Sequence, residues 1–95
     1  MGLKDGKLAE GLEAQTRQAI ENVKAILAQA GWNLSNLTKV RIFLTDMKDY
    51  GKVNEIYGSS FSGKFPTRVA LAVKDLPLGA LIELDCTAMG DSIRE

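Results

Sequence analysis

Histidine is absent from this chain of 95 residues, and cysteine occurs once, at Cys86. Without histidine, one chain can form neither a Ser-His or Cys-His catalytic couple nor a zinc site with imidazole ligands. A single cysteine excludes an internal disulfide and is typical of a reducing compartment, so we expect Cys86 to be a buried core thiol. Much of the chemistry that enzymes build on imidazole or thiolate groups is thereby excluded.

Net charge and long apolar runs are missing as well. Twelve basic and twelve acidic side chains cancel, so no overall field gathers nucleic-acid phosphates or anionic lipid. No apolar run reaches the roughly 20 residues that span a bilayer, and the N-terminus lacks the segments of a signal peptide. We therefore expect a cytoplasmic protein without a membrane partner, and the composition argues against nucleic acid as a partner.

The remaining composition predicts one small domain over residues 1–95. A hydrophobic content of 45% is enough for a core, although a chain of this length gains from association with another subunit. Apolar residues at spacings of three and four predict a helix from Leu12 to a stop at Gly31. A second, shorter amphipathic helix is predicted over residues 50–61, weakened by Gly51 and Gly58.

Apolar and polar side chains alternate, as in half-buried strands, in three segments: residues 39–45, 68–74 and 81–88. A right-handed crossover through the second helix makes the first two strands parallel, and the third should run antiparallel to one of them. The residues after 88 are expected to form a polar tail, which would leave the last strand with an exposed edge. The predicted fold class is α/β (α+β), with a mixed sheet and both helices on one face. The opposite face is expected to be uncovered within the chain, and to carry Arg41, Phe43, Arg68, Ala70, Glu83, Asp85 and Thr87.

Arg68 and Glu83 are charges inside otherwise apolar strands, which makes them the leading candidates for function. If the strands share a sheet, alternation can place both side chains on the uncovered face. A planar guanidinium suits a carboxylate ligand, and a glutamate can polarise water or move a proton. A salt bridge between subunits, or between the two residues, is the structural alternative. Asp85 is a weaker candidate, for which a solvated or intersubunit ion pair is the alternative.

Several blocks resemble the Rid family of enamine and imine deaminases, which is also described as a family of translation inhibitors or endoribonucleases. The matching blocks occur in order along nearly the whole chain, at 15–27, 43–47, 53–57, 65–68, 76–77 and 82–85. The resemblance implies a chorismate-mutase-like subunit in a homotrimer with clefts between subunits. It also implies hydrolysis of 2-aminoacrylate-type intermediates to 2-oxo acids and ammonia, without a metal or other cofactor.

Residue by residue, the resemblance assigns the substrate carboxylate to Arg68, in the Pro-x-Arg motif, and the positioning of the hydrolytic water to Glu83. Asn54, which precedes the tyrosine of the short helix, would be a supporting residue of the substrate site. Ala70 stands where many deaminating members carry a cysteine. The chain also starts after the N-terminal strands usual in the family, so it is expected to be a fragment, a mis-started form or a short relative.

Three functions are therefore open: a deaminase, a non-catalytic trimer that binds small carboxylates, and an endoribonuclease. The third is the weakest, because the chain has no histidine and no excess of basic residues.

Overall fold

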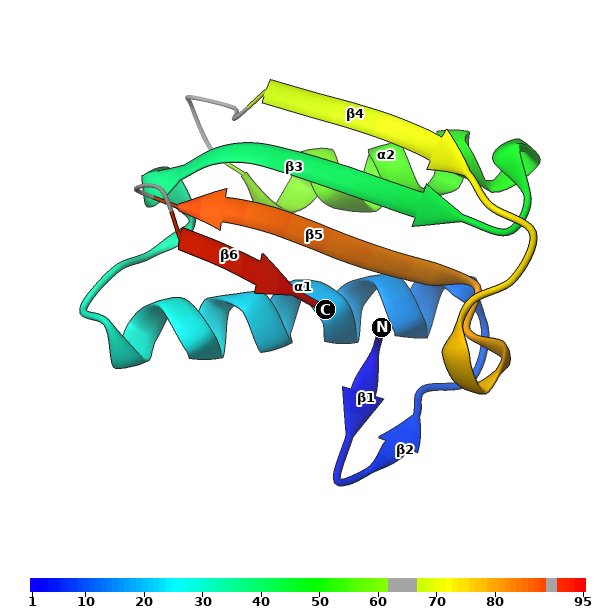
Figure 1. Cartoon of the computed structure of the whole chain (residues 1–95), viewed down its shortest axis with the longest axis horizontal. Coiled ribbons are helices and arrows are strands. Elements are labelled where there is room, and N and C mark those ends of the chain that lie inside the picture. Colours follow the sequence, from blue (N-terminus) through cyan, green and yellow to red (C-terminus); the bar gives the residue numbers. More distant parts are fainter. Residues whose placement is uncertain (62–66, 89–90) are drawn as a thin grey trace.

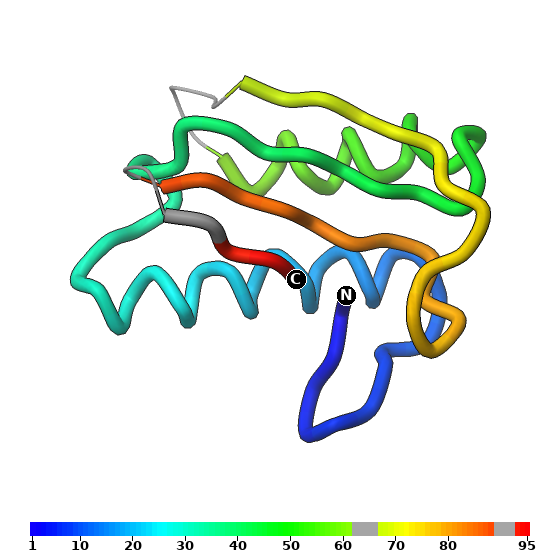
Figure 2. Tube along the Cα trace, in the orientation of Figure 1, coloured from blue at the N-terminus to red at the C-terminus, as the bar shows by residue number. Residues whose placement is uncertain are grey.

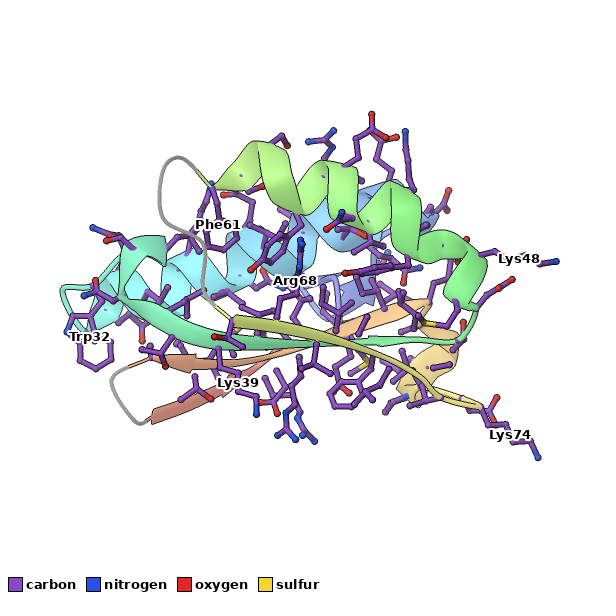
Figure 3. The ribbon with its side chains drawn as sticks, turned by 90° about the horizontal axis from the view of Figure 1, so that it is seen from above. Trp32, Lys39, Lys48, Phe61, Arg68 and Lys74 are labelled. Atoms are coloured by element: carbon purple, nitrogen blue, oxygen red, sulfur yellow. The ribbon has the colours of Figure 1, made fainter. Side chains whose placement is uncertain are left out.

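The sheet of the protein has four strands in the order β4-β3-β5-β6, and the computed structural model describes residues 1–61, 67–88 and 91–95. Both helices, α1 (Leu12–Gln29) and α2 (Tyr50–Ser60), lie on the same side of this sheet (Figure 1 and Figure 3). The strands are β3 (Leu37–Leu44), β4 (Thr67–Ala72), β5 (Ile82–Ala88) and β6 (Asp91–Arg94). The predicted α+β class, with a mixed sheet and two helices on one face, is confirmed.

The remaining elements are short. A hairpin of β1 (Leu3–Lys4) and β2 (Lys7–Leu8) precedes α1, and three 3-10 turns occupy Leu34–Asn36, Met47–Asp49 and Pro77–Gly79. Figure 2 traces the crossover from β3 through α2 to β4. β3 and β4 pair in parallel and β5 pairs antiparallel with β3, as predicted.

Helix α1 ends where the sequence predicts. Gly31 adopts a left-handed φ of 77°, and the N–H groups of Gly31 and Trp32 donate to the carbonyls of Ala28 and Leu27 at 3.0 and 2.9 Å. These two bonds satisfy carbonyls that the helix end leaves open, in a conformation that favours glycine. The turn directs Trp32 back against the core, where it is partly buried.

The far edge of β5 differs from the expectation. We expected a polar tail after residue 88 and an exposed edge on the last long strand. Instead β6 pairs antiparallel with β5, and Ile93 is buried in the core at 8% exposure. The sheet edges among the described strands are therefore β4 and β6.

The strand register decides which side chains face the helices. Val40, Ile42 and Leu44 of β3 are buried beneath the helices, and their partners in β4 are Arg68, Ala70 and Ala72. Because partnered residues point to the same face, the expectation that Arg68 and Ala70 lie on the uncovered face is wrong. The face that no described helix covers is here called the open face. It carries Lys39, Arg41, Phe43, Thr67, Val69, Leu71, Glu83, Asp85, Thr87 and Arg94.

Candidate functional site

Arg68 is the second residue of β4 and lies between that strand and α2, whereas Lys39 points away from the opposite side of the sheet (Figure 3). The Nη1 group of Arg68 donates a hydrogen bond to Oδ1 of Asn54. The guanidinium carbon also lies 5.0 Å from the centroid of the Tyr57 ring, within the range of a cation–π contact. Two groups on α2 thus hold the arginine.

Asn54 and Tyr57 are three positions apart in α2, which places both side chains on the helix side that meets β4. The Tyr57 ring is 2% exposed and packs against Phe61, with centroids 4.5 Å apart. Burial raises the pKa of Tyr57 to about 12, although the positive charge of Arg68 opposes the rise. The tyrosine is therefore a fixed, neutral platform beneath the guanidinium at physiological pH.

The arrangement suits an anionic, planar ligand. Arg68 is exposed, and Asn54 is its one hydrogen-bond partner among the residues that the structure describes. A guanidinium has five N–H donors in a fixed fork, so several donors remain for a ligand carboxylate. Asn54, predicted as a supporting substrate residue, meets Arg68; whether either residue contacts a substrate stays a prediction.

Glu83 lies elsewhere. It belongs to β5, pairs with Phe43 and faces the open face, where it is partly buried. The register places Arg68 beside Val40, three residues from Phe43 along β3 and on the opposite face. Arg68 and Glu83 are therefore separated by roughly 10 Å along the strands and by roughly 10 Å across them. Arg68 and Glu83 of one chain therefore neither share a face nor form the salt bridge considered as an alternative.

The open face has its own ionic cluster. Asp85 is 4% exposed and accepts hydrogen bonds from Arg41 and, at 3.4 Å, from Nη2 of Arg94. Burial alone would raise the Asp85 pKa, but the hydrogen bonds and charges of Arg41 and then Arg94 hold it below its usual range. Both guanidinium groups also lie near the Phe43 ring, at 6.0 and 5.8 Å from its centroid.

The buried carboxylate of Asp85 therefore forms ion pairs with Arg41 and Arg94 of the same chain, so the expectation of a solvated pair is wrong. The sequence reasoning missed Arg94, because it treated residues after 88 as a tail. Alternation of Arg94 with the buried Ile93 was the available signal.

Cys86 faces the core at 1% exposure, as expected. Burial and then the nearby charges of Asp85 and Glu95 raise its pKa to about 12, so the thiol stays protonated. Within residues 1–61, 67–88 and 91–95, no group of three potential ligands could hold a metal ion. No helix in the described part of the chain is long and apolar enough to cross a membrane. Phe65 and Pro66, from the block that ends in Arg68, lie outside the described residues.

A hollow of about 450 Å³ lies away from these charges, at the C-terminal ends of both helices. Apart from Phe61, which also contacts Tyr57, it shares no residue with the site around Arg68. Its lining is Lys24, Ala28, Trp32, Asn33, Leu34, Ser35, Ser60 and Phe61.

Comparisons with known proteins agree with one another. Residues 1–90 match the family described as Endoribonuclease L-PSP. The chain is 44% identical over 86 residues to a RutC family protein of Pyrococcus horikoshii, covering 90% of this chain and 68% of that protein. It is 39% identical over 79 residues to the 2-iminobutanoate/2-iminopropanoate deaminase of Mus musculus, covering 83% of this chain and 58% of the deaminase.

Solved structures give the same picture. A protein of the Rid family from Yersinia pestis superposes with a TM-score of 0.85 and 41% identity, over 87% of this chain and 68% of that one. TdcF of E. coli, solved with bound serine, superposes with a TM-score of 0.84 and 32% identity, over 88% and 68%. The chain thus spans about three fifths to two thirds of the length of these relatives.

Proposed function

Because the chain belongs to the endoribonuclease L-PSP family, which includes the RutC and Rid proteins, we propose that it hydrolyses reactive enamines and imines. The proposed substrates are of the 2-aminoacrylate type, and the products are 2-oxo acids and ammonia. The deaminase name of the mouse and rat relatives supports this reaction class.

One observation carries the proposal: the exposed guanidinium of Arg68, held by Asn54 over the Tyr57 ring. Every substrate of this class carries a carboxylate beside the reacting carbon. A guanidinium binds a carboxylate through two parallel hydrogen bonds, which fixes the orientation of the carbon as well as its position. The serine bound in the TdcF structure is also a small carboxylate.

The second group, Glu83, must come from another subunit if it acts with Arg68, because the two lie on opposite faces of one sheet. We therefore place the site between subunits of a homotrimer, with Glu83 of the partner subunit facing Arg68. The open face supports association, since Val69 and Leu71 are 38% and 41% exposed there beside Phe43. Apolar side chains gathered on one face are typical of an interface.

The reaction then has three steps. An enamine first takes a proton from water on its terminal carbon and returns an N–H proton to water, which gives the imine. Glu83 of the partner subunit accepts a proton from water as the oxygen bonds to the imine carbon. The C=N electron pair goes to nitrogen, which takes that proton from Glu83 of the partner subunit. The hydroxyl proton of this carbinolamine is then transferred, through Glu83 of the partner subunit or water, to the amino nitrogen. The C–N bond breaks as the carbonyl of the 2-oxo acid forms, and ammonia leaves.

A coupled assay tests the proposal. A pyridoxal-phosphate enzyme generates 2-aminoacrylate, and the rate of pyruvate and ammonia release is followed with and without the chain. We expect acceleration by the parent, a large loss in Arg68→Ala, partial retention of binding in Arg68→Lys, and binding without turnover in Glu83→Gln. An unaccelerated reaction with the parent would reject deamination.

The alternative is a non-catalytic trimer that binds small carboxylates. Two observations favour it. The site around Arg68 is formed by α2 and β4 alone, without Glu83. Ala70 in β4 also stands where the family resemblance implies a cysteine in many deaminating members. Binding of a 2-oxo acid to the parent, together with no acceleration in the coupled assay, would support this alternative.

A further inference from the structure

The contact between Arg68 and Tyr57 is not explained by core packing alone. The Tyr57 ring is almost completely buried, yet the charged group of an exposed side chain lies over it. An exposed arginine on a sheet edge would normally extend into water and sample many rotamers. Here the guanidinium lies between β4 and α2 (Figure 3).

We propose that Tyr57 is a positioning residue for Arg68: its ring face, fixed by Phe61, sets the plane of the guanidinium that receives the substrate carboxylate. The inference rests on the proposed function, because it gives Arg68 its role as the carboxylate clamp. Tyr57 itself does not touch the substrate.

Two contacts from α2 define the position and the plane of the Arg68 guanidinium. The hydrogen bond to Asn54 fixes one nitrogen, but rotation about that bond would leave the plane of the fork free. The ring of Tyr57, three residues further along α2, supplies a surface against which the guanidinium lies. A bidentate interaction needs a defined plane, so the ring contributes orientation that the hydrogen bond alone does not.

The tyrosine hydroxyl is not part of this function. It is buried and has no hydrogen-bond partner among the described residues. A buried hydroxyl without a partner lowers stability, so Tyr57→Phe should keep the ring face and relieve that cost. Tyr57→Leu, in contrast, keeps an apolar side chain and removes the ring.

The control is Tyr50→Leu. Tyr50 begins α2 and packs against the same core, where it is partly buried. Its replacement removes an aromatic ring from the same helix, so it reproduces a general effect on packing. The structure records the cation–π contact of Arg68 with Tyr57 and none with Tyr50 among the described residues.

Two measurements on the folded parent and variants test the proposal. The first is the NMR shift of the Arg68 side-chain protons without ligand, which a ring face moves upfield. The second is the affinity for 2-oxobutanoate by calorimetry. For Tyr57→Leu we expect loss of the upfield shift and binding roughly 2- to 30-fold weaker, the factor that corresponds to the range of cation–π energies. Tyr57→Phe should recover both, and Tyr50→Leu should alter neither.

Unchanged Arg68 shifts and unchanged affinity in Tyr57→Leu would overturn the inference, as would equal losses in the Tyr50→Leu control. If the parent shows the upfield shift but binds no 2-oxo acid, the clamp assignment fails, and the positioning role fails with it. If the parent binds but does not deaminate, and Tyr57→Leu weakens binding, the inference holds while the proposed reaction fails.

Discussion

Replacement of Asp85 by asparagine should lower stability by an amount that depends on pH. The Asp85 carboxylate is 4% exposed and has two guanidinium partners, whose side chains are 44% and 58% exposed. The asparagine side chain would keep an oxygen acceptor in a group of similar size. The variant therefore removes mainly the charge.

The magnitude follows from these exposures. A hydrogen bond to a charged group contributes roughly 1.5–3 kcal/mol, but solvent screens both arginines, so we expect a total loss of roughly 1–2 kcal/mol at pH 7. For a chain of this size that loss lowers Tm by roughly 4–16 °C. Glu13→Gln is the matched control, because Glu13 pairs with Arg17 on the surface, with side chains 54% and 57% exposed. Its effect should be close to zero.

Urea denaturation at several pH values checks the charge directly. The pKa of Asp85 is lowered in the folded state, so its contribution is present above the ordinary carboxyl pKa and is lost as pH falls through the folded pKa. The difference between parent and Asp85→Asn should therefore shrink below about pH 4. Equal stability of the two proteins at pH 7, or a difference that persists unchanged at pH 2, would refute the reasoning.

Three further outcomes are expected. Asn54→Asp places a carboxylate against Arg68 and should weaken 2-oxo acid binding roughly tenfold or more, whereas Asn54→Ala should weaken binding by a smaller factor. Calorimetry measures both affinities, and undiminished binding in the aspartate variant would contradict the assignment of Arg68 as the carboxylate clamp. Because the Cys86 pKa is raised to about 12, this thiol should lower the stability of the parent by up to about 1.4 kcal/mol per pH unit as pH rises above its ordinary value of 9.0. Cys86→Ala should remove this contribution in alkaline urea titrations, whereas the contribution of Tyr57, whose pKa is also raised, should remain. Leu71→Glu should reduce the sedimentation mass if the open face is the interface, whereas Ile26→Glu, at a similar exposure of 38%, should not; equal masses for Leu71→Glu and parent would exclude that face.

The fold was predictable because its elements are strongly periodic. The local signals are the apolar stripe of α1, the helix end at the left-handed Gly31 and the alternation of apolar and polar side chains in β3. The right-handed crossover through α2 then predicts the parallel pairing of β3 with β4. The strand β6 was missed because it has four residues and one buried apolar side chain, Ile93, which is too short a pattern to recognise.

The face of Arg68 was not predictable from alternation. A period of two tells which residues of one strand share a face, but the register between strands decides which face that is. Val69 and Leu71 are the larger apolar residues of β4, so the sequence pattern predicts that their side chains face the core. The structure does the reverse: the small Ala70 packs against the core, Arg68 lies over Tyr57, and the apolar pair is left exposed.

Complementation between two inactive variants tests the central claim most directly. Arg68→Ala and Glu83→Gln chains are unfolded together, mixed in equal amounts, refolded and assayed for deamination. If each site takes Arg68 from one subunit and Glu83 from its neighbour, random mixing makes about a quarter of the sites intact, since each of two independent choices succeeds half the time. We predict recovery of about a quarter of the parent activity; activity no higher than that of the separate variants would contradict a site shared between subunits.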